Sequence, residues 1–284
     1  MKTVILLTAC INPSGMSYTA LQNVELRKKQ YIDAILFYLQ KTNYNIVFCN
    51  NSGEDISSEV SIKVSQKLYS RIEFISFNGN DYNNELGKGY GEFEIIKKGV
   101  LNSVYIKNAK YILKITGRYI AVDVESVIKK TNFVTMWKQK RLYVDISDEF
   151  QSADARCFYG SKDFFLKFVN IENLVNDENK FYFEHLFYQF LCNNPLIKQE
   201  SFYITNSYIY MGELISGMSG TLGTLFHAQT YSYWDKLRLL RNYCEKEKYL
   251  IDGFFRKKWM RMISIILRFL IFINRMFFCK YGKK

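Results

Sequence analysis

Short apolar runs alternate with longer amphipathic segments over the first half of the chain. We expect strands at Lys2–Cys10, Tyr44–Cys49, Ile72–Phe77 and Tyr111–Ile115, and helices at Gln22–Leu39, Ser61–Tyr69 and Glu92–Val104. Strands that alternate with helices form βαβ units, whose sheet is parallel and buried on both faces. The pattern therefore predicts an α/β fold with a Rossmann-type, mainly parallel sheet and helices on both of its faces.

The second half is less regular. We expect strands at Arg141–Ile146, Ala155–Tyr159 and Ser201–Tyr210, helices at Phe181–Leu191 and Tyr231–Leu250, and a Gly-, Ser- and Thr-rich loop at Met211–Gly223. No internal repeat or low-complexity segment interrupts the chain. We therefore predict one domain over residues 1–250 and a separate amphipathic tail over residues 251–284.

The net charge of +12 belongs mainly to that tail. The 284 residues include 39 Lys and Arg against 27 Asp and Glu, and nine of the basic residues lie between Phe254 and Lys284, where no acidic residue occurs. A basic protein of this kind has nucleic acid or an anionic membrane as its expected partner. With 48% hydrophobic residues, the chain as a whole is not disordered.

The tail has the pattern of a helix that lies in a lipid interface. On a helical projection Lys257, Arg261, Ser264, Arg268 and Arg275 form a narrow stripe, and the other positions are almost all apolar. A core helix is the alternative, but a stretch without acidic partners disfavours burial of these cations. A nucleic-acid partner is disfavoured because the cations lie on an apolar helix. No uninterrupted run of 18 apolar residues predicts a transmembrane span.

The N-terminus and the cysteines indicate no processing or metal site. Leu7-Thr8-Ala9-Cys10 resembles a lipoprotein cleavage box, but the apolar run before it is too short for a signal peptide, so we favour a buried strand. Six scattered cysteines and two histidines lack zinc-binding spacing, and reduced thiols are expected.

Polar or Gly-containing segments follow four of the predicted strands. They are Thr8–Gly15, Asn50–Gly53, Asn78–Asn80 and Thr116–Tyr119. Ligands of open α/β sheets bind beyond the carboxyl ends of the strands. We therefore expect a binding site built from these segments, although loops are polar in most proteins.

Two motifs suit phosphate. Gly87-Lys88-Gly89-Tyr90-Gly91-Glu92 precedes a helix, where glycines permit close approach and the helix N-terminus favours an anion; a flexible helix start is the alternative. Lys114-Ile115-Thr116-Gly117-Arg118-Tyr119 offers two cations at a strand end, which suit a diphosphate. A surface turn is the alternative there.

Taken together, these segments resemble those of bacterial glycosyltransferases encoded in capsule, exopolysaccharide and O-antigen clusters. The similarity covers roughly the first 125 residues and recurs loosely at Ser152–Phe158 and Phe183–Phe187. It implies a GT-A-like domain that binds a nucleotide-sugar donor. In these segments and the Ser-rich loop we expect the donor-binding residues Thr8, Asn12, Asn51, Lys88, Tyr90, Lys114, Thr116, Arg118 and Ser219.

The sequence departs from the GT-A pattern at the metal motif. Thr116-Gly117-Arg118 stands where an Asp-X-Asp motif is usual, and the nearest acidic pair, Asp123 and Glu125, has the position of a helix start. We therefore expect no metal ligands, with Lys114 and Arg118 in place of the cation. A divalent cation, Mg²⁺ or Mn²⁺, stays open as an alternative.

Sugar transfer with inversion needs a base for the acceptor hydroxyl. The candidates are Glu184, His185, Asp154 and Asp148. Alternatively, Asp154 and Arg156 bind the acceptor or donor sugar, and Arg156 is our candidate for acceptor binding. A histidine among aromatic residues is more often a packed core residue than a catalytic one. The sequence thus predicts a peripheral glycosyltransferase at the cytoplasmic face of the bacterial inner membrane, acting on a lipid-linked polysaccharide. The alternative is a non-catalytic polysaccharide-binding protein with a transferase-like fold.

Overall fold

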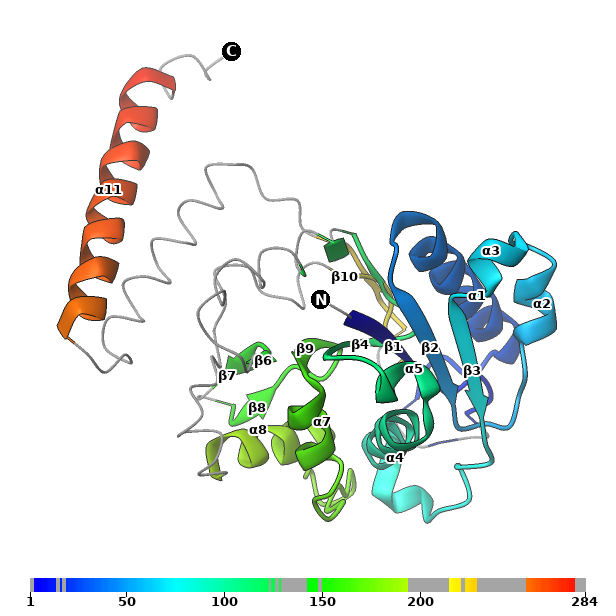
Figure 1. Cartoon of the computed structure of the whole chain (residues 1–284). Coiled ribbons are helices and arrows are strands. Elements are labelled where there is room, and N and C mark those ends of the chain that lie inside the picture. Colours follow the sequence, from blue (N-terminus) through cyan, green and yellow to red (C-terminus); the bar gives the residue numbers. More distant parts are fainter. Residues whose placement is uncertain are drawn as a thin grey trace. The chain divides into compact units, whose positions relative to one another are not determined.

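The structure is a computed structural model of the whole chain (Figure 1). It describes residues 3–13, 16, 19–122, 124–125, 128, 142–147, 150–193, 215–220, 223–228 and 254–278. The predicted strand Ser201–Tyr210 and helix Tyr231–Leu250 lie outside these residues, as do Asp123 and Asp148. The chain divides into one compact unit of Met1–Ile204 with Met211–Ala228, and a second of Thr205–Tyr210 with Gln229–Lys284. The predicted domain boundary at residue 250 stays a prediction.

The first unit contains a six-stranded sheet in the order β3-β2-β1-β4-β9-β6. Its strands are β1 (Thr3–Ala9), β2 (Asn45–Asn50), β3 (Ile72–Ser76), β4 (Tyr111–Thr116), β6 (Leu142–Tyr143) and β9 (Cys157–Ser161). The first four are parallel, and β9 pairs antiparallel with both β4 and β6. The predicted α/β class with a mainly parallel sheet is confirmed.

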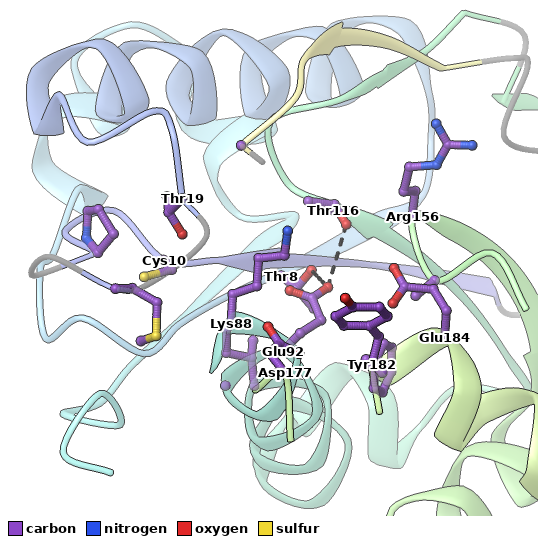
Figure 2. A pocket seen from close by; sticks show the side chains of 18 of the residues that line it. Thr8, Cys10, Thr19, Lys88, Glu92, Thr116, Arg156, Asp177, Tyr182 and Glu184 are labelled. Atoms are coloured by element: carbon purple, nitrogen blue, oxygen red, sulfur yellow. Dashed lines mark hydrogen bonds between the residues drawn. The ribbon is translucent and has the colours of Figure 1, made fainter. Parts of the chain in front are cut away.

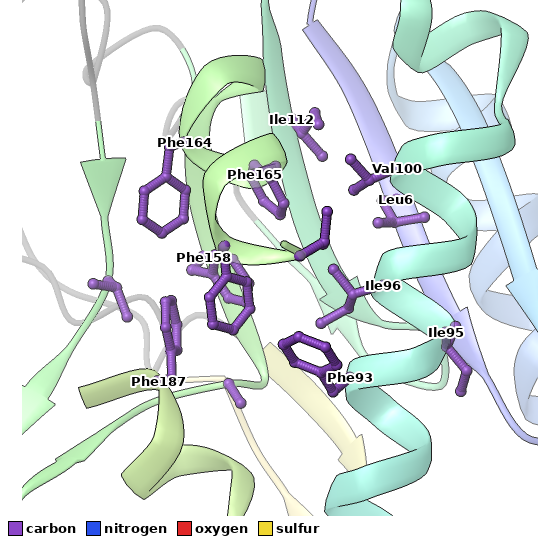
Figure 3. Packing of buried hydrophobic residues seen from close by; sticks show 14 of the residues in the cluster. Leu6, Phe93, Ile95, Ile96, Val100, Ile112, Phe158, Phe164, Phe165 and Phe187 are labelled. Atoms are coloured by element: carbon purple, nitrogen blue, oxygen red, sulfur yellow. The ribbon is translucent and has the colours of Figure 1, made fainter. Parts of the chain in front are cut away.

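Helices cover both faces of the sheet and form a hydrophobic core on each face. Alternate residues of β1 contribute to these two cores. Ile5 and Leu7 pack with α1 (Val24–Lys41) and α2 (Ser57–Ser61), whereas Val4 and Leu6 pack with α4 (Gly87–Asn102). The second core also receives α5 (Val104–Lys107), α7 (Lys162–Phe168) and α8 (Phe183–Asn193). Figure 3 shows Phe93, Ile96 and Val100 of α4 facing this aromatic-rich core.

Several predicted elements have different bounds in the structure. The helix expected at Ser61–Tyr69 is two short helices, α2 and α3 (Gln66–Tyr69), and the strand expected at Arg141–Ile146 is β6 and β7 (Ile146–Ser147). Helix α4 begins at Gly87, so the Gly-rich motif forms its first turns. The segment expected as a loop at Met211–Gly223 contains β10 (Ile215–Met218).

Strand β10 belongs to a small antiparallel sheet. It pairs with β11 (Leu225–Phe226) and with β5 (Ile120–Ala121), which follows β4 closely in the chain. A further pair joins β7 to β8 (Ser152–Ala153). These pairings bring Ser219 and Gly220 to the carboxyl end of β4.

The second unit contains α11 (Phe254–Phe278), which confirms the predicted tail helix. Ser264, Leu267 and Ile271 of this helix are buried, while much of its apolar surface is open to solvent: Met262, Ile265, Ile266, Phe269, Leu270 and Phe272. Within the described residues, no helix has both the length and the apolar character needed to cross a membrane.

Candidate functional site

A cavity of about 600 Å³ opens where the parallel strands end (Figure 2). In the sheet register Thr8 of β1 lies between Cys49 of β2 and Thr116 of β4. The cavity thus forms at the edge of the sheet that the sequence predicted.

Most of the predicted site residues line this cavity. They are Thr8, Asn51, Lys88, Thr116, Arg118, Arg156, Glu184, His185 and Ser219. Four others do not: Asn12, Tyr90, Lys114 and Asp154. The Asn12 carbonyl accepts a hydrogen bond from Asn80 at 3.0 Å, and the Tyr90 ring packs on Tyr82.

Lys114 takes part in an internal ion pair rather than facing the cavity. Its side chain is completely buried, and its ammonium pairs with Glu92 while donating to the Ala155 carbonyl and, at 3.2 Å, to the Thr116 hydroxyl. The ammonium also lies 5.8 Å from the centre of the Phe158 ring. Lys114 therefore does not line the cavity, and its charge is balanced by Glu92 within the protein.

Glu92 connects several of these residues, although no role was predicted for it from the sequence. Its carboxylate accepts from the Thr8 hydroxyl at 2.7 Å and lies 3.5 Å from that of Thr116. Burial raises the pKa of Glu92, but the charge and hydrogen bond of Lys114 and the hydrogen bond of Thr8 outweigh burial and leave this pKa below its ordinary value. Glu92 therefore presents an ionised carboxylate at the cavity.

The N-terminus of α4 carries a carboxylate of the protein itself. Asp177 lies beside the backbone N–H groups of Lys88 and Gly89, which lower its pKa, although burial has the larger effect and the pKa is raised overall. A Cβ on Gly87 would lie 2.1 Å from an Asp177 oxygen, and φ of Gly87 is +76°. Because residue 87 is a glycine, the Asp177 side chain can pack against it. Asp177 thus occupies the helix N-terminus where the sequence predicted a phosphate.

Lys88 projects into the cavity from the first turn of α4 (Figure 2). Burial lowers the pKa of its ammonium, while Glu184 and Asp177 act in the opposite direction. The charge of Lys88 therefore interacts with two carboxyl groups of the same cavity.

Glu184 lies in the first turn of α8, at the cavity wall. Burial raises the pKa of this carboxyl, a hydrogen bond from its own backbone N–H and the charge of Lys88 lower it, and the charge of Asp154 raises it; the net shift is upward. In the view of Figure 2, Glu92 and Glu184 lie on either side of the Tyr182 ring. The cavity thus holds two carboxyl groups whose pKa values are displaced in opposite directions.

His185 lies at the same wall, where its Nδ1 accepts from the Tyr182 backbone N–H at 3.3 Å. Its ring lies 5.4 Å from that of Tyr182 and 6.1 Å from that of Phe181. The histidine is therefore half-buried among aromatic rings and also borders the cavity.

Asp154 and Arg156 form a two-point ion pair. The Asp154 carboxylate accepts from Arg156 Nη2 at 2.6 Å and from its Nε at 2.9 Å. The hydrogen bonds to Asp154 raise the pKa of the guanidinium. Arg156 lines the cavity and Asp154 does not, so Asp154 positions the arginine rather than meeting a ligand.

Arg118 joins β4 to the β10 segment across the cavity wall. Its Nη1 donates to the Met218 carbonyl at 2.9 Å, and its guanidinium lies about 6 Å from the Tyr31 and Tyr119 rings. Buried Ser219 and its neighbour Gly220 line the cavity beside it.

The cavity includes buried polar atoms without a hydrogen-bond partner among the described residues, some of them from residues that the sequence did not predict. Unpartnered buried atoms include Oδ1 of Asn51, Asn80 and Asp177 and Nε of Arg118, all from residues that line the cavity. Such atoms are rare in protein interiors, and their concentration here indicates a polar ligand. Asn80 follows β3 within a predicted site segment, whereas Arg27 and Asp177 have no local sequence signal.

No resident metal is indicated by the described side chains. Among them, no group of three or more His, Cys, Asp or Glu could hold a metal ion.

Comparison with known proteins gives little. No protein-family model and no curated protein matches the sequence. A solved structure described as a cytidylyltransferase from Leptospira borgpetersenii serovar Hardjo-bovis (strain JB197) is similar at 15% identity, over 72% of this chain and 77% of that one, with a TM-score of 0.39. A similarity at this level says nothing about activity.

Proposed function

We propose that the protein is a glycosyltransferase that moves a sugar from a nucleotide-sugar donor to a lipid-linked polysaccharide acceptor. The observation that carries the proposal is the cavity at the carboxyl ends of the strands. It combines cations, Lys88 and Arg118, with a carboxyl group, Glu184, whose pKa is raised by burial. Transfer needs these two features together, one for the departing diphosphate and one for the acceptor hydroxyl.

Glu184 fits the role of the base. The acceptor hydroxyl oxygen forms a bond to the anomeric carbon as its proton passes to the Glu184 carboxylate, and the bond from that carbon to the diphosphate oxygen breaks. A base works best when its pKa lies near the working pH, so the upward shift of the Glu184 pKa favours proton transfer.

The cations fit the leaving group. Negative charge grows on the diphosphate as the bond breaks, and fixed cations in a partly desolvated cavity stabilise that charge. Glu92, held ionised by Lys114, is an acceptor suited to a hydroxyl group of the donor sugar. Two carboxyl groups with opposite pKa shifts are a frequent arrangement where one binds or stabilises and the other exchanges a proton.

The tail helix supports a lipid-linked acceptor. Nine basic residues between Phe254 and Lys284 accompany a helix whose large apolar side chains are exposed. Such a helix suits an anionic membrane surface, where each cation contributes on the order of 1 kcal/mol. We therefore place the protein at the cytoplasmic face of the bacterial inner membrane as a peripheral protein.

The test is a transfer assay with the full chain. UDP-, GDP- and CMP-sugars are offered with lipid-linked saccharides from a bacterial membrane extract, with and without Mg²⁺ or Mn²⁺, and release of the nucleotide is measured. We expect release with one donor, and its loss in Glu184→Gln but not in the surface control Glu178→Gln. Binding of a saccharide without release from any donor would support the non-catalytic alternative. Absence of both would refute the proposal.

A further inference from the structure

Two buried arginines line the cavity and form no ion pair with a described residue, although the charge of Arg118 helps to lower the pKa of Glu92. Arg27 is 4% exposed and Arg118 is 8% exposed, and neither forms an ion pair with any described residue. A buried charge without an opposite charge is costly unless other groups compensate for it. The two guanidinium groups therefore make this wall of the cavity a place for an anion.

Both arginines contact Tyr31. Arg27 Nη2 lies 3.5 Å from the Tyr31 hydroxyl, and the Arg118 guanidinium carbon lies 6.0 Å from the centre of the Tyr31 ring. Both charges also act on Cys10, which lines the cavity, where each of them lowers a thiol pKa that burial raises.

The hydrogen bonds of Arg27 are directed to the backbone. Its Nε donates to the Cys10 carbonyl at 2.9 Å and its Nη1 to the Leu21 carbonyl at 3.0 Å. These bonds tie the segment after β1 to the start of α1. Arg27 is therefore a positioning residue that also supplies positive charge.

Arg118 has a different pattern, with one edge of its guanidinium unused. Nη1 is bound to the Met218 carbonyl, Nε is buried and without a partner, and Nη2 makes no hydrogen bond to a described residue. A Cβ on Gly220 would lie 2.5 Å from Nη2, so a larger residue there would push this end of the guanidinium aside. The Nε–Nη2 edge carries two parallel N–H groups, which match two oxygens of one phosphate.

We propose that the Nε–Nη2 edge of Arg118 binds a phosphate oxyanion of the ligand, with Arg27 supplying the second positive charge and holding the adjoining loop. Arg27 thereby takes the part that the sequence predicted for Lys114, whose charge is balanced by Glu92. The inference locates the diphosphate within the proposed function, but it requires only a phosphate-bearing ligand and no sugar transfer.

The experiment measures binding of inorganic pyrophosphate to the full chain by calorimetry, with malonate as a carboxylate control. We expect Arg118→Gln to raise the Kd for pyrophosphate at least tenfold, and Arg118→Lys to recover only part of the affinity because it keeps the charge without the planar edge. Lys63→Gln, which removes an exposed cation outside the cavity, should change the Kd less than about twofold. Preferred binding of malonate over pyrophosphate would overturn the phosphate assignment.

A second variant guards against misfolding. Gly220→Ala keeps every charge but places a methyl group against Nη2, so it should also weaken pyrophosphate binding at least tenfold. Arg27→Lys should bind pyrophosphate more tightly than Arg27→Gln, because lysine keeps the positive charge. If the role of Arg27 were purely structural, both variants would bind pyrophosphate equally weakly. An unchanged Kd in both Arg118→Gln and Gly220→Ala would overturn the inference.

The two proposals fail separately. Pyrophosphate binding that depends on Arg118, without transfer from any nucleotide sugar, would retain this site and refute the proposed activity. Sugar transfer by the wild type, together with normal pyrophosphate binding in the Arg118 variants, would retain the proposed activity and refute this site.

Discussion

The Glu92 carboxylate and the Lys114 ammonium form an ion pair that joins the second turn of α4 to the centre of β4. Lys114 is completely buried and Glu92 reaches the cavity with 22% of its side chain exposed. The pair therefore has two roles. It balances the charge of a buried cation, and it keeps the carboxylate of Glu92 ionised at the cavity.

The first prediction concerns the coupling of these two charges. Glu92→Gln should lower the free energy of unfolding by about 3–5 kcal/mol, because it leaves Lys114 buried without a partner. Lys114→Met should also destabilise the protein, and the double variant should recover much of the loss. Urea unfolding of the four proteins measures the coupling. Losses that simply add would contradict it.

The pair should also govern stability in acid. The folded-state pKa of Glu92 is lowered, so its contribution is present above the unfolded value of about 4.5 and is lost as the pH falls through the lowered folded value. The double variant Glu92→Gln with Lys114→Met should therefore lose less stability than the wild type as the pH falls below 4.5. Urea midpoints measured between pH 6 and pH 3 test this, and parallel curves would argue against it.

Glu184 should behave in the opposite way. Its folded-state pKa is raised, so the ionised form opposes folding at neutral pH, and stability increases as the pH falls through that pKa toward the unfolded value of about 4.5. Glu184→Gln should therefore raise the free energy of unfolding at pH 7 by about 0.5–2 kcal/mol, while it lowers the transfer rate by roughly 10²–10⁴. In the wild type the acid limb of the pH–rate profile should lie above 4.5. A destabilised variant with full activity would remove Glu184 from the proposed role.

The sequence predicted the sheet well because its signal is local. Strands β1 to β4 are apolar runs that end at polar residues, and their parallel order places those ends together. The start of α4 was predicted too late because glycines disfavour helices, whereas here Asp177 packs against Gly87 and interacts with the backbone N–H groups of the first turn.

Two cations have surroundings that depend on contacts between distant segments. Lys114 has the sequence pattern of a phosphate ligand, and only the packing of α4 on β4 reveals that Glu92 balances its charge. Arg27 has the pattern of a surface cation on an amphipathic helix, but its hydrogen bonds to Cys10 and Leu21 bury it at the cavity. Charge patterns alone cannot distinguish a cation that is neutralised internally from one that is held for a ligand.

Gly87 should be required for the shape of the site. Gly87→Ala combines a positive φ of 76° with a contact of 2.1 Å to Asp177, and we expect a loss of about 1–3 kcal/mol in stability. Gly223→Ala is the matched control, because φ of Gly223 is +66° while the nearest atom to its Cβ lies 3.8 Å away. Urea unfolding should show the larger loss for Gly87→Ala. Equal losses would mean that Asp177 moves aside freely.

The exposed apolar face of α11 should determine membrane binding. Ile265 and Phe269 are 66% and 62% exposed, and burial of such side chains in lipid contributes about 1.5–3 kcal/mol each. Ile265→Ser with Phe269→Ser should therefore reduce flotation with phosphatidylglycerol vesicles at least tenfold. Ile62→Ser is the control, since Ile62 is 83% exposed in the other unit and should leave flotation unchanged. Added salt should weaken binding of the wild type through the cations of the tail. Undiminished flotation of the double variant would show that this face does not enter the lipid.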